Sequence, residues 1–214
     1  MSQIEFIPII KPATKGDSDG ITLPSGDFLT NPAEWEKYCQ QKIKKTYGDF
    51  PEPILKGTFQ FRLFDLELEH IEKIIEMHIG DTDVNESISL FGGYAISKNG
   101  IIELFPQCCG LLEDIQSWKK ILNENFEDFS LGECHPSPLI TKRKNEIIIH
   151  CKDSEEDFFP FNNKEEIKLD YYETRIAFEK LLSELDKLSK KINSLSAKFK
   201  TENLAEIMIW GKQE

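Results

Sequence analysis

An apolar seam in the last quarter of the chain restricts the possible folds more than any other sequence feature. Its members recur at alternating steps of three and four residues: Tyr171, Thr174, Phe178, Leu181, Leu185, Leu188, Ile192, Leu195 and Phe199. This spacing brings all of these side chains to one side of a helix, so it predicts one long helix over residues 171–199. Asp170 followed by Glu173 is a capping pair, which predicts that the helix begins at Tyr171.

The seam can pack in two ways. In a parallel coiled-coil dimer, charged residues beside the seam should meet opposite charges, but Glu184 and Lys191 would meet Ser189 and Ser196 of the second copy. Leu182 also widens the apolar stripe, as in a helix that lies on its own domain. Packing within the chain is therefore the favoured interpretation, and self-association through residues 171–199 is the alternative.

The rest of the chain mixes short strand patterns with helical patterns. In chain order, the patterns predict a strand over 4–10, a helix over 32–47, a strand over 57–68, a helix over 69–79, a hairpin of 89–97 with 101–105, a helix over 111–123, a hairpin of 139–141 with 146–151, and a short helix over 204–210. Asn99-Gly100 supplies the two positive φ angles of a type I′ hairpin turn. We therefore predict a single α+β domain over 1–214. A mainly antiparallel, twisted sheet within 1–168 is covered by helices, and 169–214 adds a long C-terminal helix.

The charge balance bears on the kind of partner. Asp and Glu outnumber Lys and Arg by 38 to 26, which gives a net charge of -12. Such a surface repels phosphate backbones and anionic membranes, so we expect neither nucleic acid nor membrane as a partner. It suits a protein that stays dispersed in solution, or one whose partner is basic. The segment 153–157 is the most acidic loop, and we expect Glu155, Glu156 and Asp157 to be exposed there.

The cysteines and the N-terminal sequence bear on the compartment. The chain has five cysteines, an odd number without the spacing of a disulfide framework, which is typical of a reducing compartment. The first ten residues lack a basic segment and contain Glu5 and Pro8, so they do not have the pattern of a signal peptide. We therefore expect a cytoplasmic protein.

Cysteine and histidine occur in neighbouring pairs that could be metal ligands: Cys108-Cys109, Cys134-His135 and His150-Cys151. Adjacent residues of an extended chain point to opposite faces, and the two-residue gap typical of zinc sites is missing. Gly92-Gly93 lacks the Lys-Ser/Thr of a phosphate-binding loop. We therefore expect no metal and no cofactor.

Cys109 is the one candidate nucleophile. It precedes a predicted helix, whose N-terminus would lower the pKa of a thiol. His135 or His150 could act as the base, with Asp114 to orient it. Glu113 and Asp114 oppose thiolate formation, so a packed turn is the favoured interpretation. A Cys-dependent hydrolase or transferase is the alternative.

Two motifs carry a resemblance to known proteins. The first is the hairpin Phe91-Gly-Gly-Tyr-Ala-Ile-Ser-Lys-Asn-Gly, and the second is the turn Pro106-Gln-Cys-Cys-Gly, which leads into a segment with Asp114-Ile and Trp118. Over residues 89–120 the chain resembles a group of bacterial proteins without assigned enzymatic activity. That group is similar to the immunity-type proteins that accompany secreted toxins. The resemblance implies a small binding protein.

Charge and resemblance together favour a non-enzymatic binding protein, most concretely an immunity-type antitoxin that blocks a basic toxin domain. The candidate contact residues lie in the turn and in the acidic loop: Gln107, Cys108, Cys109, Glu155, Glu156 and Asp157. We expect a monomer or a weak homodimer. Apart from the Cys109 enzyme, the alternative is a scaffold protein that dimerises through 171–199.

Overall fold

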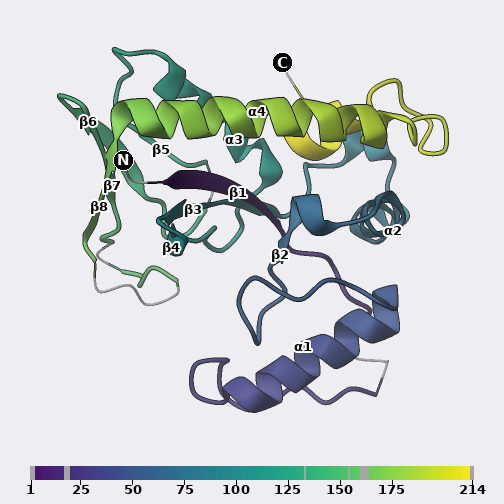
Figure 1. Cartoon of the computed structure of the whole chain (residues 1–214). Coiled ribbons are helices and arrows are strands. Elements are labelled where there is room, and N and C mark those ends of the chain that lie inside the picture. The colour runs from purple at the N-terminus through teal and green to yellow at the C-terminus, as the bar shows by residue number, and fades with distance from the viewer. Residues whose placement is uncertain (1–2, 17–19, 133, 154, 160–163, 213–214) are drawn as a thin grey trace.

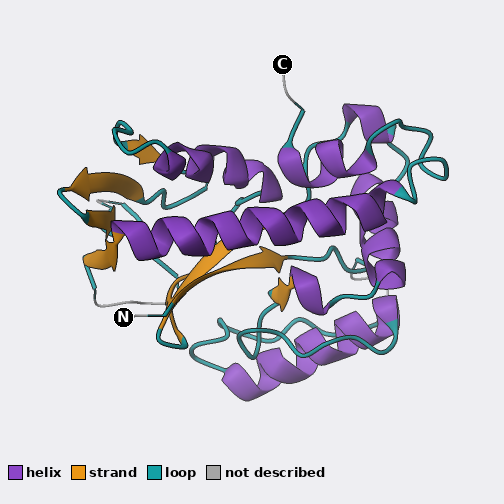
Figure 2. Cartoon of the chain, turned by 45° about the horizontal axis from the view of Figure 1, so that its top comes forward, coloured by secondary structure: helices purple, strands orange, loops and turns teal. Residues whose placement is uncertain are grey.

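The computed structural model describes residues 3–16, 20–132, 134–153, 155–159 and 164–212. Helices and antiparallel sheets occur together, which confirms the α+β class (Figure 2). The strands are β1 (Ile4–Ile10), β2 (Phe61–Arg62), β3 (Gly92–Lys98), β4 (Ile101–Leu104), β5 (Phe129–Ser130), β6 (Leu139–Arg143), β7 (Glu146–His150) and β8 (Glu166–Asp170). The α-helices are α1 (Pro32–Tyr47), α2 (Leu68–Ile79), α3 (Ile115–Trp118) and α4 (Tyr171–Asn193). A π-helical segment, Glu206–Trp210, lies near the end of the described chain.

The strands form two four-stranded sheets, whereas the sequence patterns predicted one. The first sheet has the order β2-β1-β3-β4 and the second the order β5-β6-β7-β8, with every neighbouring pair antiparallel. Lys98, at the hairpin of the first sheet, donates a hydrogen bond from Nζ to the backbone oxygen of Lys168 in β8 (2.9 Å). This bond ties the two sheets together at one edge.

Helix α4 confirms the predicted seam and its packing within the chain. The helix lies over the first sheet, where it contacts β1, and the N-terminal end of the helix contacts β7 and β8 of the second sheet (Figure 1). All seven seam residues from Tyr171 to Ile192 are buried. The carboxylate of Asp170 accepts a hydrogen bond from the backbone N–H of Glu173 (2.9 Å), as the capping pair predicted. The helix ends at Asn193, so Leu195 and Phe199 lie beyond it in a turn.

The first sheet is covered on both faces. On the α4 side, Phe6 of β1 meets Trp118 and Phe178 with ring centroids 5.2 and 5.3 Å apart. On the other side, Ile9 belongs to a small second core together with Ile7 and Ala95. Helix α1 lies on that side, opposite α4 (Figures 1 and 2). A sheet buried on both faces has near-continuous apolar strands, and β3 is buried from Gly92 to Ser97.

The second sheet packs against the main core with one face only. Its inner residues belong to the main core: Ile140, Ile147, Ile149, Ile167 and Leu169. Its outer face is largely polar, with a hydrogen bond between Thr141 Oγ1 and His150 Nε2 (3.0 Å) and an ion pair between Glu166 and Lys168 (3.2 Å). A strand of a sheet with one core face and one polar face alternates between buried and exposed residues, and β8 does so at every position.

Two predicted elements differ in the structure. The strand predicted over 57–68 is wrong except at Phe61–Arg62, because β1 pairs with this segment only through Ile9 and Ile10. A 3₁₀ turn, Leu63–Asp65, follows. The helix predicted over 111–123 is a 3₁₀ turn, one turn of α-helix (α3) and a second 3₁₀ turn. The reason lies in the spacing of its fully buried residues, Leu112, Ile115, Trp118 and Ile121. A step of three residues is the period of a 3₁₀-helix.

The remaining predicted elements are confirmed. Gly48 and Gly80 follow α1 and α2 with positive φ, and Asn99 and Gly100 have the φ angles of 56° and 78° expected at the hairpin turn. None of the helices in the described part of the chain combines the length and apolar character that a membrane-spanning segment needs.

Candidate functional site

The turn at residues 106–110 lies between the two sheets. It follows β4 of the first sheet, and it pairs with the segment that leads into β6 of the second sheet. Cys108 and His135 exchange two backbone hydrogen bonds, from Cys108 N–H to His135 O (3.1 Å) and from His135 N–H to Cys108 O (3.0 Å). This bridge fixes the main chain of the turn where the sheets meet.

Gln107 is buried and holds a distant segment against the turn. Its side chain is 3% exposed, whereas the sequence predicted an exposed contact residue. The amide Nε2 donates to Phe159 O (2.8 Å), and Oε1 accepts from Phe159 N–H (2.8 Å). Nε2 also donates to Phe105 O (2.7 Å). We call the two bonds between Gln107 and Phe159 the amide pairing. Gln107 is therefore not exposed as predicted, and it holds the segment at Phe159 in position from inside the protein.

The amide pairing brings the acidic loop to the turn. Gln107 and Phe159 are 52 residues apart in the sequence, and Phe159 follows Asp157 by two positions. Within the loop, Asp153 Oδ1 accepts hydrogen bonds from the N–H groups of Glu155 (2.8 Å) and Glu156 (3.3 Å), which gives the loop a turn of its own. The two sets of residues that the sequence suggested separately are thus held by one buried side chain.

The exposed residues around this pairing form one candidate site, which we call the junction surface. It consists of Cys108, Cys109, His135, Glu155, Glu156 and Asp157, all of which are exposed. The ring of Phe159 packs against two other rings and so holds the acidic loop to the rest of the domain. Its centroid is 5.0 Å from that of Phe28 and 6.1 Å from that of Phe105. The loop that contains Phe28 was not predicted to take part, because no local pattern links it to the turn.

The cysteines of the turn differ from the buried ones. The Sγ atoms of Cys108 and Cys109 are 3.4 Å apart, and Cys109 has a φ of 61°. Burial raises the pKa of Cys39 to about 12 and that of Cys151 to about 11, so both thiols stay protonated and unreactive at neutral pH. Burial likewise raises the pKa of Cys134. None of the five cysteines, all within the described residues, is in a disulfide.

Lys11 brings a positive charge to the turn. Its ammonium donates a hydrogen bond to the backbone oxygen of Gln107 (2.8 Å). Burial lowers the pKa of Lys11, while Cys108, Cys109 and Cys134 act in the opposite direction. These three thiols are therefore within electrostatic range of the ammonium.

Asp114 lies beneath the junction surface. Burial raises the pKa of its carboxyl group to about 6, and a hydrogen bond from the Leu111 N–H to Oδ2 (3.2 Å) acts in the opposite direction. Asp114, Trp118 and Cys134 line a cavity of about 10 Å³, which is roughly the size of one water molecule.

Of the two predicted bases, His135 is bridged through its backbone to Cys108, next to Cys109, whereas His150 lies away from the turn. His150 lies on the outer face of the second sheet, bonded to Thr141 and 3.6 Å from the carboxylate of Glu166. Asp114 accepts the hydrogen bond from Leu111. The segment after Cys109 has only one turn of α-helix, so it offers little of the helix dipole that the sequence prediction invoked. Neither Cys109 nor a histidine is among the residues that line the small cavity at Asp114.

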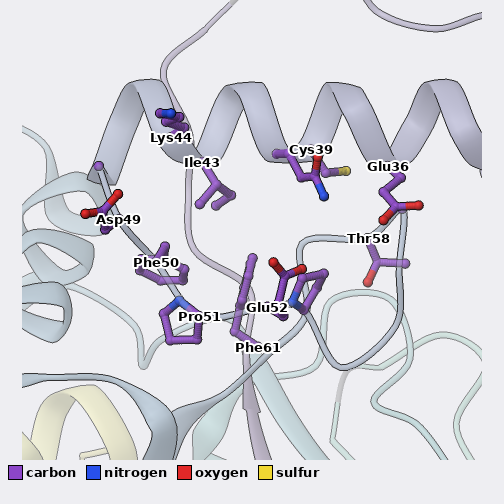
Figure 3. A pocket seen from close by; sticks show the side chains of 14 residues that line it. Glu36, Cys39, Ile43, Lys44, Asp49, Phe50, Pro51, Glu52, Thr58 and Phe61 are labelled. Atoms are coloured by element: carbon purple, nitrogen blue, oxygen red, sulfur yellow. The ribbon is translucent and has the colours of Figure 1, made fainter.

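A separate pocket, which the sequence analysis missed, lies between α1 and the segment that follows it (Figure 3). Its volume is about 330 Å³. Cys39 and Ile43 of α1 face Phe50 and Phe61 across it (Figure 3). The sequence predicted the apolar side of α1. It also predicted a strand over 57–68, which includes residues that line this pocket, so the pocket itself was not predicted. The rim carries both signs of charge: Glu36, Lys44, Asp49 and Glu52.

Two of the titratable groups at this pocket are paired or kept neutral. Glu36 is paired with Lys56 (3.0 Å), and the thiol of Cys39 has its pKa raised to about 12 by burial. Within the described residues, no three His, Cys, Asp or Glu side chains gather in a way that could hold a metal ion. The pocket can therefore accept a small apolar group, while the junction surface carries the polar and reactive side chains.

No family model, curated protein or solved structure matches this chain. The resemblance of residues 89–120 to immunity-type proteins stays a prediction.

Proposed function

We propose that this chain is a non-enzymatic binding protein whose junction surface holds a basic protein partner. The observation that supports this most is the amide pairing of Gln107 with Phe159. A buried side chain that makes two hydrogen bonds to the backbone of a distant loop fixes that loop in one position. A loop held in its binding conformation loses less conformational entropy when a partner binds.

The charge of the acidic loop supports a basic partner. Among the described residues, no cation forms an ion pair with Glu155, Glu156 or Asp157. The nearest lysine in the sequence, Lys152, is paired with Glu165 (2.8 Å). Three exposed carboxylates without local compensation attract a basic surface and accelerate its association.

The partner class that we propose is a basic toxin domain, because residues 89–120 resemble immunity-type proteins and the acidic charge of the chain favours a basic partner. The chain would cover the cleft of the toxin and exclude its substrate, and it would act in the cytoplasm as a monomer or a weak homodimer. The cysteines at the turn would contribute shape and a soft contact surface, with the carboxylates supplying most of the electrostatic attraction.

The test is to co-express the chain with the protein encoded by the adjoining reading frame. We expect that protein to stop growth of the host when expressed alone, and the chain to restore growth. The triple charge reversal E155K/E156K/D157K should lower the association rate constant about 10- to 100-fold at low salt. The matched control D81K/D186K/E202K, at exposed positions elsewhere, changes the net charge equally and should leave the rate within about twofold.

A second variant tests the role of the amide pairing. Gln107→Leu keeps the charge of the acidic loop but removes its hydrogen bonds to Phe159. It should therefore weaken binding through loss of order in the loop, and hydrogen exchange of the Phe159 amide should accelerate. An adjoining protein that is harmless to the host, or equal association rates for the charge reversal and its control, would overturn the proposed function.

A further inference from the structure

The thiols of Cys108 and Cys109 lie side by side on a rigid support. Adjacent side chains of an extended chain point to opposite faces, yet these two Sγ atoms are only 3.4 Å apart. The left-handed conformation of Cys109, with φ of 61°, permits this arrangement. A residue with a side chain adopts such a conformation only at a cost in free energy. The surrounding fold therefore maintains the proximity of the thiols at a cost in stability.

Several contacts hold the turn in this conformation. The main chain of Cys108 is fixed by its two hydrogen bonds to His135. The carbonyl of Gln107 accepts a hydrogen bond from Lys11, and the side chain of Gln107 is anchored at Phe105 and Phe159. Both cysteines nevertheless remain exposed to solvent. Two accessible sulfur atoms on a fixed main chain have the arrangement of a preformed two-thiol ligand.

Direct disulfide formation between these neighbours is unfavourable. The Cα atoms of adjacent residues are about 3.8 Å apart, below the range of about 4.4–6.8 Å in which disulfides form without strain. A third atom bonded to both sulfurs removes this difficulty, because the sulfurs then need to approach only to about their present separation. The geometry therefore favours a bridging atom over an S–S bond.

The surroundings restrict which bridging atom fits. Within the described residues no third His, Cys, Asp or Glu completes a metal site. Within the part of the chain that the structure describes, an ion that needs three or four protein ligands therefore has no third ligand beside the two thiols. An ion that binds two ligands in a line needs them on opposite sides, whereas these thiols lie side by side. A soft centre that needs two thiolates on one side and brings its own third substituent satisfies these conditions.

We propose that Cys108 and Cys109 form a bidentate binding site for a trivalent organoarsenical. In the reaction, each sulfur forms a bond to arsenic, and each of two As–OH bonds breaks. Each hydroxide leaves with a thiol proton, so two water molecules are released. The arsenic stays trivalent, and neither an oxidant nor a reductant is required. The ammonium of Lys11 donates a hydrogen bond to the carbonyl oxygen of Gln107 (2.8 Å), which holds the residue before the two cysteines in place.

The test uses the full chain and phenylarsine oxide, with mass spectrometry and thiol titration as readouts. We expect one adduct per chain that blocks two of the five thiols, persists in excess glutathione and is removed by dithiothreitol. Cys108→Ser and Cys109→Ser should each weaken the adduct about 100-fold or more, because the second bond forms within an already bound complex. Their folding is checked by circular dichroism, and both positions are exposed.

Cys39→Ser and Cys134→Ser are the controls, at buried cysteines outside the pair. Both should keep the full adduct in glutathione. An adduct that survives in both single variants of the pair, or that maps to a buried cysteine, would overturn the assignment. So would a loss in Cys134→Ser as large as that in Cys109→Ser, since a third thiol would then belong to the site. The outcome does not depend on whether a toxin is the partner.

Discussion

The two sheets have the same number of strands and the same antiparallel pairing, but they are buried differently. The first sheet is covered on one face by α4 and the main core, and on the other by the second core around Ile9. The second sheet has a core face and an outer face of charged and polar side chains. The first sheet is therefore an internal support, and the second is partly surface.

The junction surface combines the properties of both sheets. Its turn is continuous with β4 of the first sheet, and its acidic loop lies between β7 and β8 of the second sheet. A turn on a covered sheet is held in place, and a loop on a one-sided sheet is accessible to a partner. This difference shows how a small domain can present an exposed surface that is also fixed.

The largest expected effect comes from the residue that links the sheets. The ring of Trp118 is fully buried and contacts Phe6 of β1 at 5.2 Å and Phe129 of β5 at 6.0 Å. Trp118→Ala should lower the free energy of unfolding by about 3–5 kcal/mol through lost burial and a cavity. Hydrogen exchange should show loss of protection in β3 and β7 together. Loss in one sheet alone would mean that the sheets are stabilised independently.

Two isoleucines allow a comparison of the sheet faces that point away from the main core. Ile9 is fully buried in the second core, and Ile148 is 2% exposed among the side chains of the outer face. Ile9→Ala should cost about 3–4 kcal/mol of unfolding free energy, and Ile148→Ala about 2 kcal/mol. The reason is that flexible side chains at a surface can move into the space left by Ile148. Urea denaturation gives both values, and equal costs would contradict the comparison.

Asp114, which lies near the boundary between the sheets, should make the free energy of unfolding depend on pH. Its folded-state pKa of about 6 lies above the ordinary value of 3.8, so the folded state holds the proton more tightly between these values. Stability should therefore fall as pH rises from about 4 to about 6, by about 1–2 kcal/mol after allowance for partial solvent screening. Asp114→Asn should be more stable than the wild type at pH 7 and should lose this pH dependence in thermal unfolding. If the wild type instead became more stable than the variant as pH rises from about 4 to about 6, the pKa of Asp114 would be lowered in the folded state and the prediction would be wrong.

The sequence predicted those parts of the fold that neighbouring residues determine. Strand β1, the hairpin at Asn99-Gly100 and the ends of α1 and α2 depend on short-range patterns, and the structure has them. The strand predicted over 57–68 failed because pairing depends on what β1 offers, which a local pattern does not contain. The three-residue spacing from Leu112 to Ile121 was present in the sequence and would have indicated 3₁₀ turns.

The candidate site could be predicted only in pieces. The exposure of Cys108, Cys109 and the acidic loop followed from polar and turn-forming context. Their union depends on the amide pairing of Gln107 with Phe159, a contact over 52 residues, and no periodicity encodes such a contact. The side-by-side thiols depend on a single φ angle at Cys109, which favours glycine and is not expected of cysteine.

The hydrogen bond from Lys98 to the backbone of Lys168 affects whether two molecules of this protein can associate through their sheet edges. β8 is the last strand of its sheet, and unpaired carbonyl groups there are acceptors for a strand from another chain. The ammonium of Lys98 occupies one of these acceptors, and the alternating charges of Glu166, Lys168 and Asp170 line the same margin. At the margins formed by β2 and β5, only two residues are in strand conformation, too few to template a growing fibril. The fold thus protects the chain from aggregation by strand addition at these three margins.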